Sequence, residues 1–305
     1  MSLTPHRANF STAWAPAKVN LDLHVGPPGA GGLHPLDSLV VFADTRAADR
    51  ISARPAPQLS LRVEGPGAKQ LKNAPNNLTL AAAMALRDAC ERGGLGAGLV
   101  LHKELPIAGG VGGGSSDAAA TLHVLNEMWG IEFGEAALER LAIQLGSDVP
   151  ACVRLRPLVM RGTGERLLDI VTPDLPAVLV NPGIKLETRK VFDRFDQLGA
   201  SRTFRETDPP WGHDVASLAG ALQDYRNDLQ AAAIALCSEV ERALNMIRAE
   251  PGCLLARMSG SGPTCFGLFA DDASAEAAAR KIAEVKRKYW VRATTLRGVS
   301  SAPNN

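Results

Sequence analysis

The chain has 305 residues, of which 46% are hydrophobic and 21% are charged, a globular composition that excludes disordered, collagen-like and coiled-coil classes. Lys and Arg number 33 against 32 Asp and Glu, so the net charge is +1 and no overall field draws the chain to nucleic acid or to an anionic membrane. Any anionic ligand therefore requires a local site, and at roughly 100–200 residues per domain the length predicts two domains.

Periodic apolar patterns predict mixed strands and helices along both halves of the chain. In chain order we expect strands at 19–25, 39–43 and 59–63, a helix at 78–92, a strand at 99–103, helices at 118–129 and 135–145, strands at 158–161, 167–171 and 177–180, a helix at 227–248, a strand at 265–270 and a helix at 274–288. This order predicts the α+β fold class.

Neither the N-terminus nor the cysteine and histidine spacing indicates export, membrane insertion or metal binding. The first 25 residues lack a basic segment followed by an apolar stretch and a cleavage site, and no apolar run reaches the length of a membrane span. The five cysteines form no C-x-x-C pair and the six histidines form no H-x-x-x-H pair. We therefore expect a cytoplasmic location and no structural metal, and we interpret the cysteines as small core residues.

The segment PIAGGVGGGSSD at 106–117 is the strongest functional signal, because five of the six residues from Gly109 to Gly114 are glycine. Glycines let successive backbone N–H groups point inward, and the helix that follows adds the positive end of its dipole. Ser115 and Ser116 could cap that helix or contact phosphate oxygens or magnesium. Since a flexible linker would not join a strand to a strongly periodic helix, the segment predicts a phosphate-binding loop.

This loop lacks the features of three common nucleotide sites. The Walker A motif requires a Lys after its last glycine, and this loop has none there. The Rossmann spacing G-x-G-x-x-G also fails, because the final position is not matched. A protein kinase would require H-R-D and D-F-G segments after the loop, and neither is found.

The loop instead resembles the second motif of the GHMP superfamily, named for galactokinase, homoserine kinase, mevalonate kinase and phosphomevalonate kinase. The segment RMSGSGP at 257–263 resembles the third motif of this superfamily, although its glycines could also form a simple tight turn. Six segments resemble, in order, the GHMP family that phosphorylates the 2-hydroxyl of 4-diphosphocytidyl-2-C-methyl-D-erythritol in the non-mevalonate isoprenoid pathway. They are PAKVNL (16–21), HPLDSL (34–39), GGGSSDAA (112–119), GSDVP (146–150), GTGE (162–165) and RND (226–228).

The resemblance implies a two-domain GHMP-kinase fold with its active site in a cleft between the halves. Residues 1–160 would form a ribosomal-S5-like ATP-binding domain with the phosphate loop, and residues 161–305 a ferredoxin-like domain. The implied ligands are a small-molecule substrate and ATP with Mg²⁺ as a substrate complex, without a tightly bound metal. No nucleic-acid or membrane partner is expected, and the chain would be a monomer or a weak homodimer.

The resemblance also assigns roles to individual residues. Asp148 would be the general base, and Lys18 would lower the pKa of the hydroxyl or of the aspartate and steady developing charge. The implied ATP-binding residues are Asn77, Pro106, Ile107, Ala108, Gly109, Gly110, Val111, Gly112, Gly113, Gly114, Ser115 and Ser116. The implied substrate contacts are Asn20 beside the reacting alcohol, His34 and Lys103 near the cytidine and diphosphate, Phe192 against the cytosine ring, and Thr188.

From the residues alone, simpler roles stay open for three of these side chains. Asp148 could cap a helix that begins at Val149, Asn77 could cap the helix that follows it, and Lys18 could be a solvated residue at a strand edge. Two other functions also remain: a homoserine- or mevalonate-type kinase, and a nucleotide-binding regulator without catalysis. The presence of both Lys18 and Asp148 favours an enzyme.

The chain departs from the family pattern at the expected base-binding segment. Where the family usually has R-x-D-G-Y-H, residues 29–34 read GAGGLH, so Leu33 replaces a stacking tyrosine. The aromatic pair usual after D-V-P is replaced by Ala151 and Cys152. Because stacking contributes about 1–3 kcal/mol per base, we expect weaker base recognition.

Overall fold

The computed structural model describes residues 11–29, 31–71, 77–90, 94–199, 204 and 206–299. The chain forms two compact units whose segments alternate along the sequence. The first unit comprises Met1–Ala15, Asp49–Glu104 and Gly114–Arg154, and the second comprises Pro16–Ala48, Leu105–Gly113 and Leu155–Asn305. Residues 16–48, 105–113 and 155–160 of the expected N-terminal domain belong to the second unit, and the division at residue 160 stays a prediction.

The first unit is built on a four-stranded sheet with the order β1-β5-β7-β6. Its strands are β1 (Ser11–Pro16), β5 (Ala48–Pro55), β6 (Ser60–Glu64) and β7 (Ala97–His102), and its helices are α1 (Ala68–Leu71), α2 (Leu78–Ala89), α3 (Gly113–Met128), α4 (Glu135–Leu145) and α5 (Val149–Arg154). Strand β7 pairs antiparallel with β5 and parallel with β6, and its residues alternate between buried and half-buried.

Local capping explains where the predicted helices of this unit begin and end. The Asn77 side chain accepts a hydrogen bond from the Thr79 N–H at 2.9 Å, which starts α2 at Leu78. The predicted residues 91 and 92 of this helix lie outside the described residues. Helix α4 has the predicted bounds, and the N–H of Gly146 closes it by donating to the Ala142 carbonyl.

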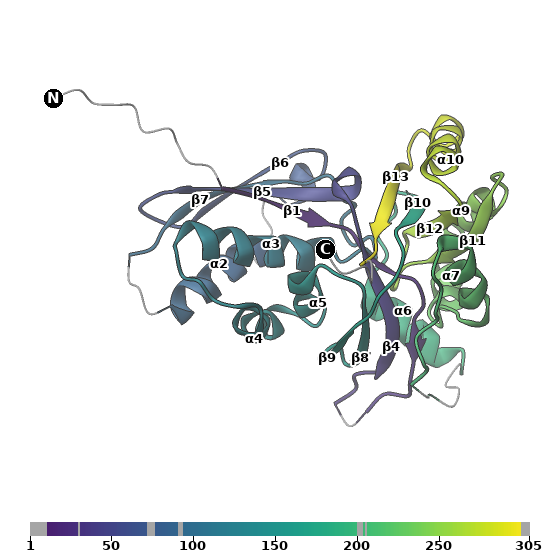
Figure 1. The fold of residues 1–305 in the computed structure, drawn as a ribbon, viewed down its shortest axis with the longest axis horizontal. Helices are drawn as coiled ribbons and strands as arrows, with labels where there is room; N and C mark the ends of the chain where they lie inside the picture. Colours follow the sequence, from purple (N-terminus) through teal and green to yellow (C-terminus); the bar gives the residue numbers. More distant parts are fainter. Residues whose placement is uncertain are drawn as a thin grey trace. The chain divides into compact units, whose positions relative to one another are not determined.

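The second unit contains a nine-stranded sheet in which seven strands follow the order β11-β12-β10-β13-β4-β8-β9, and β2 and β3 pair with β4. The strands are β2 (Lys18–Asn20), β3 (His24–Val25), β4 (Leu36–Ala43), β8 (Leu158–Gly162), β9 (Arg166–Asp169), β10 (Leu175–Asn181), β11 (Cys253–Met258), β12 (Cys265–Phe269) and β13 (Trp290–Arg297). Figure 1 shows the N-terminal strand β4 beside β8, and the C-terminal strand β13 beside β10. Non-local pairing of this kind explains why the units alternate along the sequence.

Two sequence predictions in this sheet had different outcomes. The predicted hairpin is confirmed, since β8 and β9 pair antiparallel with Met160 opposite Leu167. The single strand predicted at 19–25 is wrong, because the Asp22 carboxylate accepts the Leu39 N–H at 2.6 Å and interrupts the strand between β2 and β3.

Helices cover both faces of this sheet. The helices of the second unit are α6 (Thr188–Gln197), α7 (Val215–Ala221), α8 (Gln230–Leu236), α9 (Ser238–Arg248) and α10 (Asp272–Val285), with short 3₁₀ turns η1 (Thr45–Ala47) and η2 (Leu222–Asp224). Along β10, Val178 and Val180 pack in one core cluster with Ile247 of α9, whereas Leu179 packs in another with Leu218 of α7. Consecutive strand residues point to opposite faces, so the sheet is buried on both sides.

The helix predicted at 227–248 is two helices. Cys237 adopts an extended conformation, with φ −149° and ψ 96°, between α8 and α9. Among the described residues, no helix is long and apolar enough to cross a membrane.

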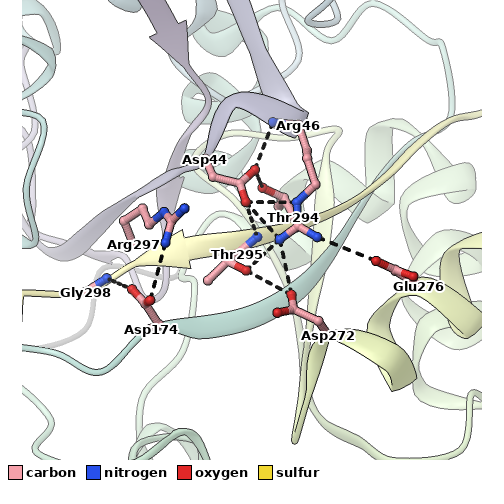
Figure 2. Close-up of polar contacts among 9 residues, drawn as sticks. All are labelled: Asp44, Arg46, Asp174, Asp272, Glu276, Thr294, Thr295, Arg297 and Gly298. Atoms are coloured by element: carbon pink, nitrogen blue, oxygen red, sulfur yellow. Dashed lines mark hydrogen bonds and ion pairs between the residues drawn. The ribbon is translucent and has the colours of Figure 1, made fainter.

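A polar cluster joins the end of β4 and η1 to β13 and α10 within the second unit (Figure 2). Asp44 accepts hydrogen bonds from the Arg46 N–H at 2.9 Å and from the Thr294 hydroxyl at 2.8 Å. Arg46 in turn reaches Asp272 at 3.2 Å and the Thr295 hydroxyl at 2.6 Å. Burial alone would raise the pKa of Asp44, but the hydrogen bonds from Arg46 and the two threonines outweigh burial and lower the pKa.

We expect Asp44→Asn to lower the Tm by about 3 °C or more, because the uncharged amide cannot satisfy the same donors. Since folding lowers the pKa of Asp44, the stability that its charge adds is present above about pH 4 and is lost as the pH falls. Thermal melts from pH 7 to pH 3 should therefore show the two proteins converging.

Asp174→Asn is the matched control. Asp174 contacts Arg297 and the Gly298 N–H (Figure 2), but its side chain is 54% exposed, against 10% for Asp44. Its Tm should stay close to that of the wild type. Equal losses in the two variants would contradict the role given to Asp44.

Candidate active site

The glycine-rich loop, residues 105–113, is anchored in the second unit and ends where α3 begins. Leu105 and Val111 are buried, with exposed fractions of 2% and 1%. Gly110 has φ +74°, and a Cβ there would lie 2.7 Å from the carbonyl oxygens of both Ser259 and Gly262. Glycine is therefore required at residue 110 both by the backbone conformation and by the close approach of a second segment.

That second segment is the turn at 259–262, which is hydrogen-bonded to the loop. The Ser259 hydroxyl donates to the Gly110 carbonyl at 3.0 Å, and the Thr264 N–H donates to the Gly109 carbonyl at 3.0 Å. A Cβ on Gly260, which has φ +55°, would lie 3.0 Å from the Gly110 oxygen. The glycines form the tight turn that the sequence left open as an alternative, and this turn also supports the loop.

Strand β2 lies against the same loop and carries Lys18 and Asn20. The Lys18 N–H donates to the Val111 carbonyl at 2.9 Å, and the Asn20 N–H donates to the Ser259 hydroxyl at 3.1 Å. The Lys18 ammonium donates to the Asn20 side-chain oxygen at 3.2 Å, and both side chains are at most 3% exposed. The second unit thus places a lysine and an amide beside the glycine-rich loop, and Lys18 is a buried residue rather than a solvated one.

A chain of hydrogen bonds fixes the orientation of the Asn20 amide. Its Nδ2 donates to the Ser38 hydroxyl at 2.7 Å, and that hydroxyl donates to the Asp22 carbonyl at 2.6 Å. Because Nδ2 is the donor, the Asn20 oxygen is directed to the Lys18 ammonium. Burial raises the pKa of the Asp22 carboxyl to about 7, although the Leu39 N–H opposes this shift.

His34, Phe192 and Thr188 also belong to the second unit. The His34 Nδ1 donates to the Gly26 carbonyl at 2.8 Å, and its ring lies 5.1 Å from the Phe192 ring. The hydroxyls of Thr188 and Ser261 are 2.9 Å apart, so Thr188 adjoins the 259–262 turn. Leu33 is 66% exposed.

The remaining candidate residues belong to the first unit: Asn77, Lys103, Gly114, Ser115, Ser116 and Asp148. Asp148 is half-buried and directly precedes α5, and its carbonyl accepts the Cys152 N–H. The Ser116 hydroxyl is 1% exposed and donates to the Cys152 sulfur at 3.4 Å. The capping role of Asn77 is confirmed, whereas its contact with ATP and the pairing of Asp148 with Lys18 stay predictions.

Lys103 is held in a buried charge cluster with two carboxylates. Its Nζ lies 2.5 Å from Asp49 Oδ2 and 2.6 Å from Asp117 Oδ2, and all three side chains are at most 5% exposed. Burial alone would lower the pKa of Lys103, but Asp117 and Asp49 reverse the direction and raise it. Burial raises the pKa of Asp117. This environment indicates a structural role, and the expected contact with a diphosphate stays a prediction.

Lys103→Met should lower the free energy of unfolding by about 3–5 kcal/mol, because it leaves two buried carboxylates without their cation. Denaturant unfolding at pH 7 measures this loss, with Lys69→Met on the exposed surface of the same unit as the control. Unchanged stability together with a raised KM for the acceptor substrate would instead assign Lys103 to substrate binding.

Several residues that hold the site in place are not among the site residues predicted from the sequence. Asn227 donates from Nδ2 to the carbonyls of Met258 and Gly260, both at 2.8 Å, and so supports the 259–262 turn. Asp37 pairs with Arg161 at 3.1 Å. Asn227 lies in the RND segment, and Asp37 and Ser38 lie in the HPLDSL segment. The sequence therefore marked these residues as part of family motifs but did not show what they contact. In the described part of the chain, no three His, Cys, Asp or Glu side chains are grouped as metal ligands.

Two family models match the chain: the GHMP kinases N terminal domain at residues 77–154 and the GHMP kinases C terminal domain at residues 206–288. Together with the fold, these matches define an α+β small-molecule kinase of the GHMP class. The 4-diphosphocytidyl-2-C-methyl-D-erythritol kinase of Hyphomonas neptunium is 46% identical over 289 residues, which cover 93% of this chain and 96% of that protein. The chain belongs to the family of 4-diphosphocytidyl-2-C-methyl-D-erythritol kinases.

Further relatives agree with this assignment. The same kinase of Cereibacter sphaeroides is 45% identical over 291 residues, covering 95% of this chain and all of that protein. A crystal structure of 4-(cytidine 5'-diphospho)-2C-methyl-D-erythritol kinase superimposes with a TM-score of 0.73 at 32% identity, covering 94% of this chain and 100% of the other. Homoserine kinase from Cytophaga hutchinsonii shares the fold, with a TM-score of 0.65 at 15% identity, and covers 98% of both chains.

Proposed function

We propose that the chain transfers the γ-phosphoryl group of ATP to the 2-hydroxyl of 4-diphosphocytidyl-2-C-methyl-D-erythritol. One observation carries the proposal: the phosphate loop, the Lys18 strand and the 259–262 turn are hydrogen-bonded into one assembly in the second unit. We infer the substrate from the relatives, which are 45–46% identical to this chain and are named as kinases of this compound.

In the proposed step, the substrate oxygen forms a bond to the γ-phosphorus while the bond to the bridging oxygen of ADP breaks. Asp148 accepts the hydroxyl proton, and Lys18 offsets the negative charge that develops on the reacting oxygens. The backbone N–H groups of the loop bind the phosphates. ATP enters as its Mg²⁺ complex, for which Ser115 and Ser116 supply candidate hydroxyl ligands.

The substrate side of the proposed site is formed by Asn20, His34, Thr188 and Phe192. Because a carbonyl only accepts hydrogen bonds, the bond to Gly26 places a proton on His34 Nδ1 and fixes the ring plane. Phe192 then offers a ring face to the base. A cytoplasmic monomer or weak homodimer, without a nucleic-acid partner, completes the proposal.

The test is ADP release from ATP with 4-diphosphocytidyl-2-C-methyl-D-erythritol, homoserine or mevalonate as the acceptor. We expect turnover with the first and only the acceptor-free background with the other two. Turnover with homoserine or mevalonate and none with the cytidine substrate would refute the proposed substrate and leave the kinase class intact.

Leu33→Tyr should lower the KM for the cytidine substrate about fivefold or more, because a second aromatic face adds about 1–3 kcal/mol of stacking. The kcat should change little, since Leu33 is remote from the reacting oxygen in the proposed arrangement. Leu236→Tyr, at another exposed leucine of the second unit, is the control. An unchanged KM in Leu33→Tyr would remove residue 33 from base recognition.

A further inference from the structure

A cavity of about 410 Å³ lies in the second unit between β11, the end of α9 and the segment 223–230. It is lined by Gln223, Tyr225, Arg226, Asn227, Gln230, Arg248, Cys253, Leu254, Leu255, Ala256 and Arg257. Its volume falls in the range of about 300–1,000 Å³ that is usual for small-molecule sites. None of the lining residues was assigned to ATP or substrate.

The charged residues that line this cavity are all arginines. Arg257 is only 7% exposed, and no carboxylate among the described residues forms an ion pair with it. Its Nη1 donates to the Leu21 carbonyl at 2.7 Å, and its Nη2 donates to the carbonyls of Leu222 and Tyr225 at 2.8 and 2.7 Å. Two of its five N–H donors thus have no partner in the described part of the chain.

The other two arginines leave part of their donors for a ligand. Arg226 pairs through Nε with Asp228, which is not among the lining residues, and Arg248 bonds Asn245 through Nη1. Burial lowers the pKa of Arg257 to about 10, although Asp22 opposes the shift. A cation buried with so little counter-charge is stabilised by any anion that enters the cavity.

The edge of β11 adds two backbone groups to this cavity. Gln223 donates to the Leu254 carbonyl at 3.1 Å, and the Met258 N–H donates to the Gln230 side chain at 3.0 Å. Alternate residues of a strand direct their N–H and C=O groups to the same side, so those of Ala256 face the same outer edge. Among the described residues, no partner covers the Ala256 groups on that edge.

We propose that this cavity is a binding site for a small molecule with a phosphate group, distinct from the sites for ATP and for the acceptor. Arg226, Arg248 and Arg257 hold the anion, since guanidinium groups bind phosphate through paired N–H donors. The Ala256 N–H and C=O offer a donor and an acceptor to the rest of the ligand.

The first test is calorimetric titration of inorganic pyrophosphate into the wild type, Arg248→Glu and Arg287→Glu. Arg287 is exposed and outside the cavity, so it matches the charge change without touching the site. Arg248→Glu removes a charged hydrogen bond and introduces a negative charge that repels the pyrophosphate, so we expect it to weaken binding at least about tenfold. Arg287→Glu should keep the wild-type affinity. Equal effects in both variants, or no binding to the wild type, would overturn the proposal.

A second readout locates the pyrophosphate. Cys253 lines the cavity and is half-buried, whereas Cys90 is half-buried in the first unit. Pyrophosphate should slow iodoacetamide labelling of Cys253 at least about threefold, by blocking access to the thiolate, and leave the labelling of Cys90 unchanged in peptide mass spectra. An unprotected Cys253 would show that pyrophosphate binds elsewhere and would overturn the site even if the titration shows binding.

Discussion

Replacing Asp148 with asparagine should lower kcat at least about 100-fold and leave the KM for ATP within about twofold of the wild type. Asparagine has nearly the same shape as aspartate but cannot accept the proton of the 2-hydroxyl. The loss therefore falls on the chemical step, while the phosphate loop still binds ATP. Steady-state kinetics with varied ATP and saturating cytidine substrate measure both constants.

Asp88→Asn provides the control, because Asp88 lies on α2 of the same unit with its side chain 66% exposed. Its kinetic constants should equal those of the wild type. If Asp148→Asn kept the wild-type kcat, Asp148 would have no part in the chemistry, and a mechanism in which the hydroxyl loses its proton late, without a base, would replace the one proposed here.

Gly110→Ala should reduce kcat/KM for ATP at least about 100-fold, because a misplaced binding loop forfeits several kcal/mol of transition-state stabilisation. The added Cβ would lie 2.7 Å from two carbonyl oxygens of the 259–262 turn, so the loop and the turn have to separate. Because Lys18 is hydrogen-bonded to the loop at Val111, this separation would displace both Lys18 and the loop N–H groups that are proposed to bind phosphate.

Gly130→Ala separates this steric effect from backbone strain. Gly130 also has a positive φ, +58°, but nothing lies within 4 Å of its Cβ position. The control should lose only about 1–2 kcal/mol of stability and keep its kcat/KM. Equal kinetics for the two variants would show that contact between loop and turn is not needed for ATP use.

Features that depend on neighbouring residues were predictable from the sequence. Helix α4 has its predicted bounds because its capping glycine lies next to its last turn, and the glycine-rich loop was recognised because its conformation needs glycine at fixed places. The break at Cys237 was not predictable, since the apolar periodicity continues from α8 into α9.

Features that depend on distant residues were missed. Strand β13 pairs with β10 and β4 and shows no regular alternation of buried and exposed residues, so a local pattern does not reveal it. The partners of Lys103 are 54 and 14 residues away in the sequence, so a local pattern does not reveal the buried ion cluster, and the contact of Lys103 with a diphosphate stays a prediction. The motif at 226–228 was recognised in the sequence, but only the structure shows that Asn227 supports the 259–262 turn.

The most direct test of the proposed function is the structure of the product. ATP and 4-diphosphocytidyl-2-C-methyl-D-erythritol with a ¹³C-labelled 2-methyl group should yield one phosphomonoester whose phosphorus couples to the labelled carbon, since the 2-hydroxyl and the methyl group share one carbon atom. ³¹P and ¹³C NMR spectra of the reaction mixture show this coupling while the diphosphate signals persist. A phosphomonoester without coupling to the methyl carbon, or no product at all, would contradict the proposed reaction.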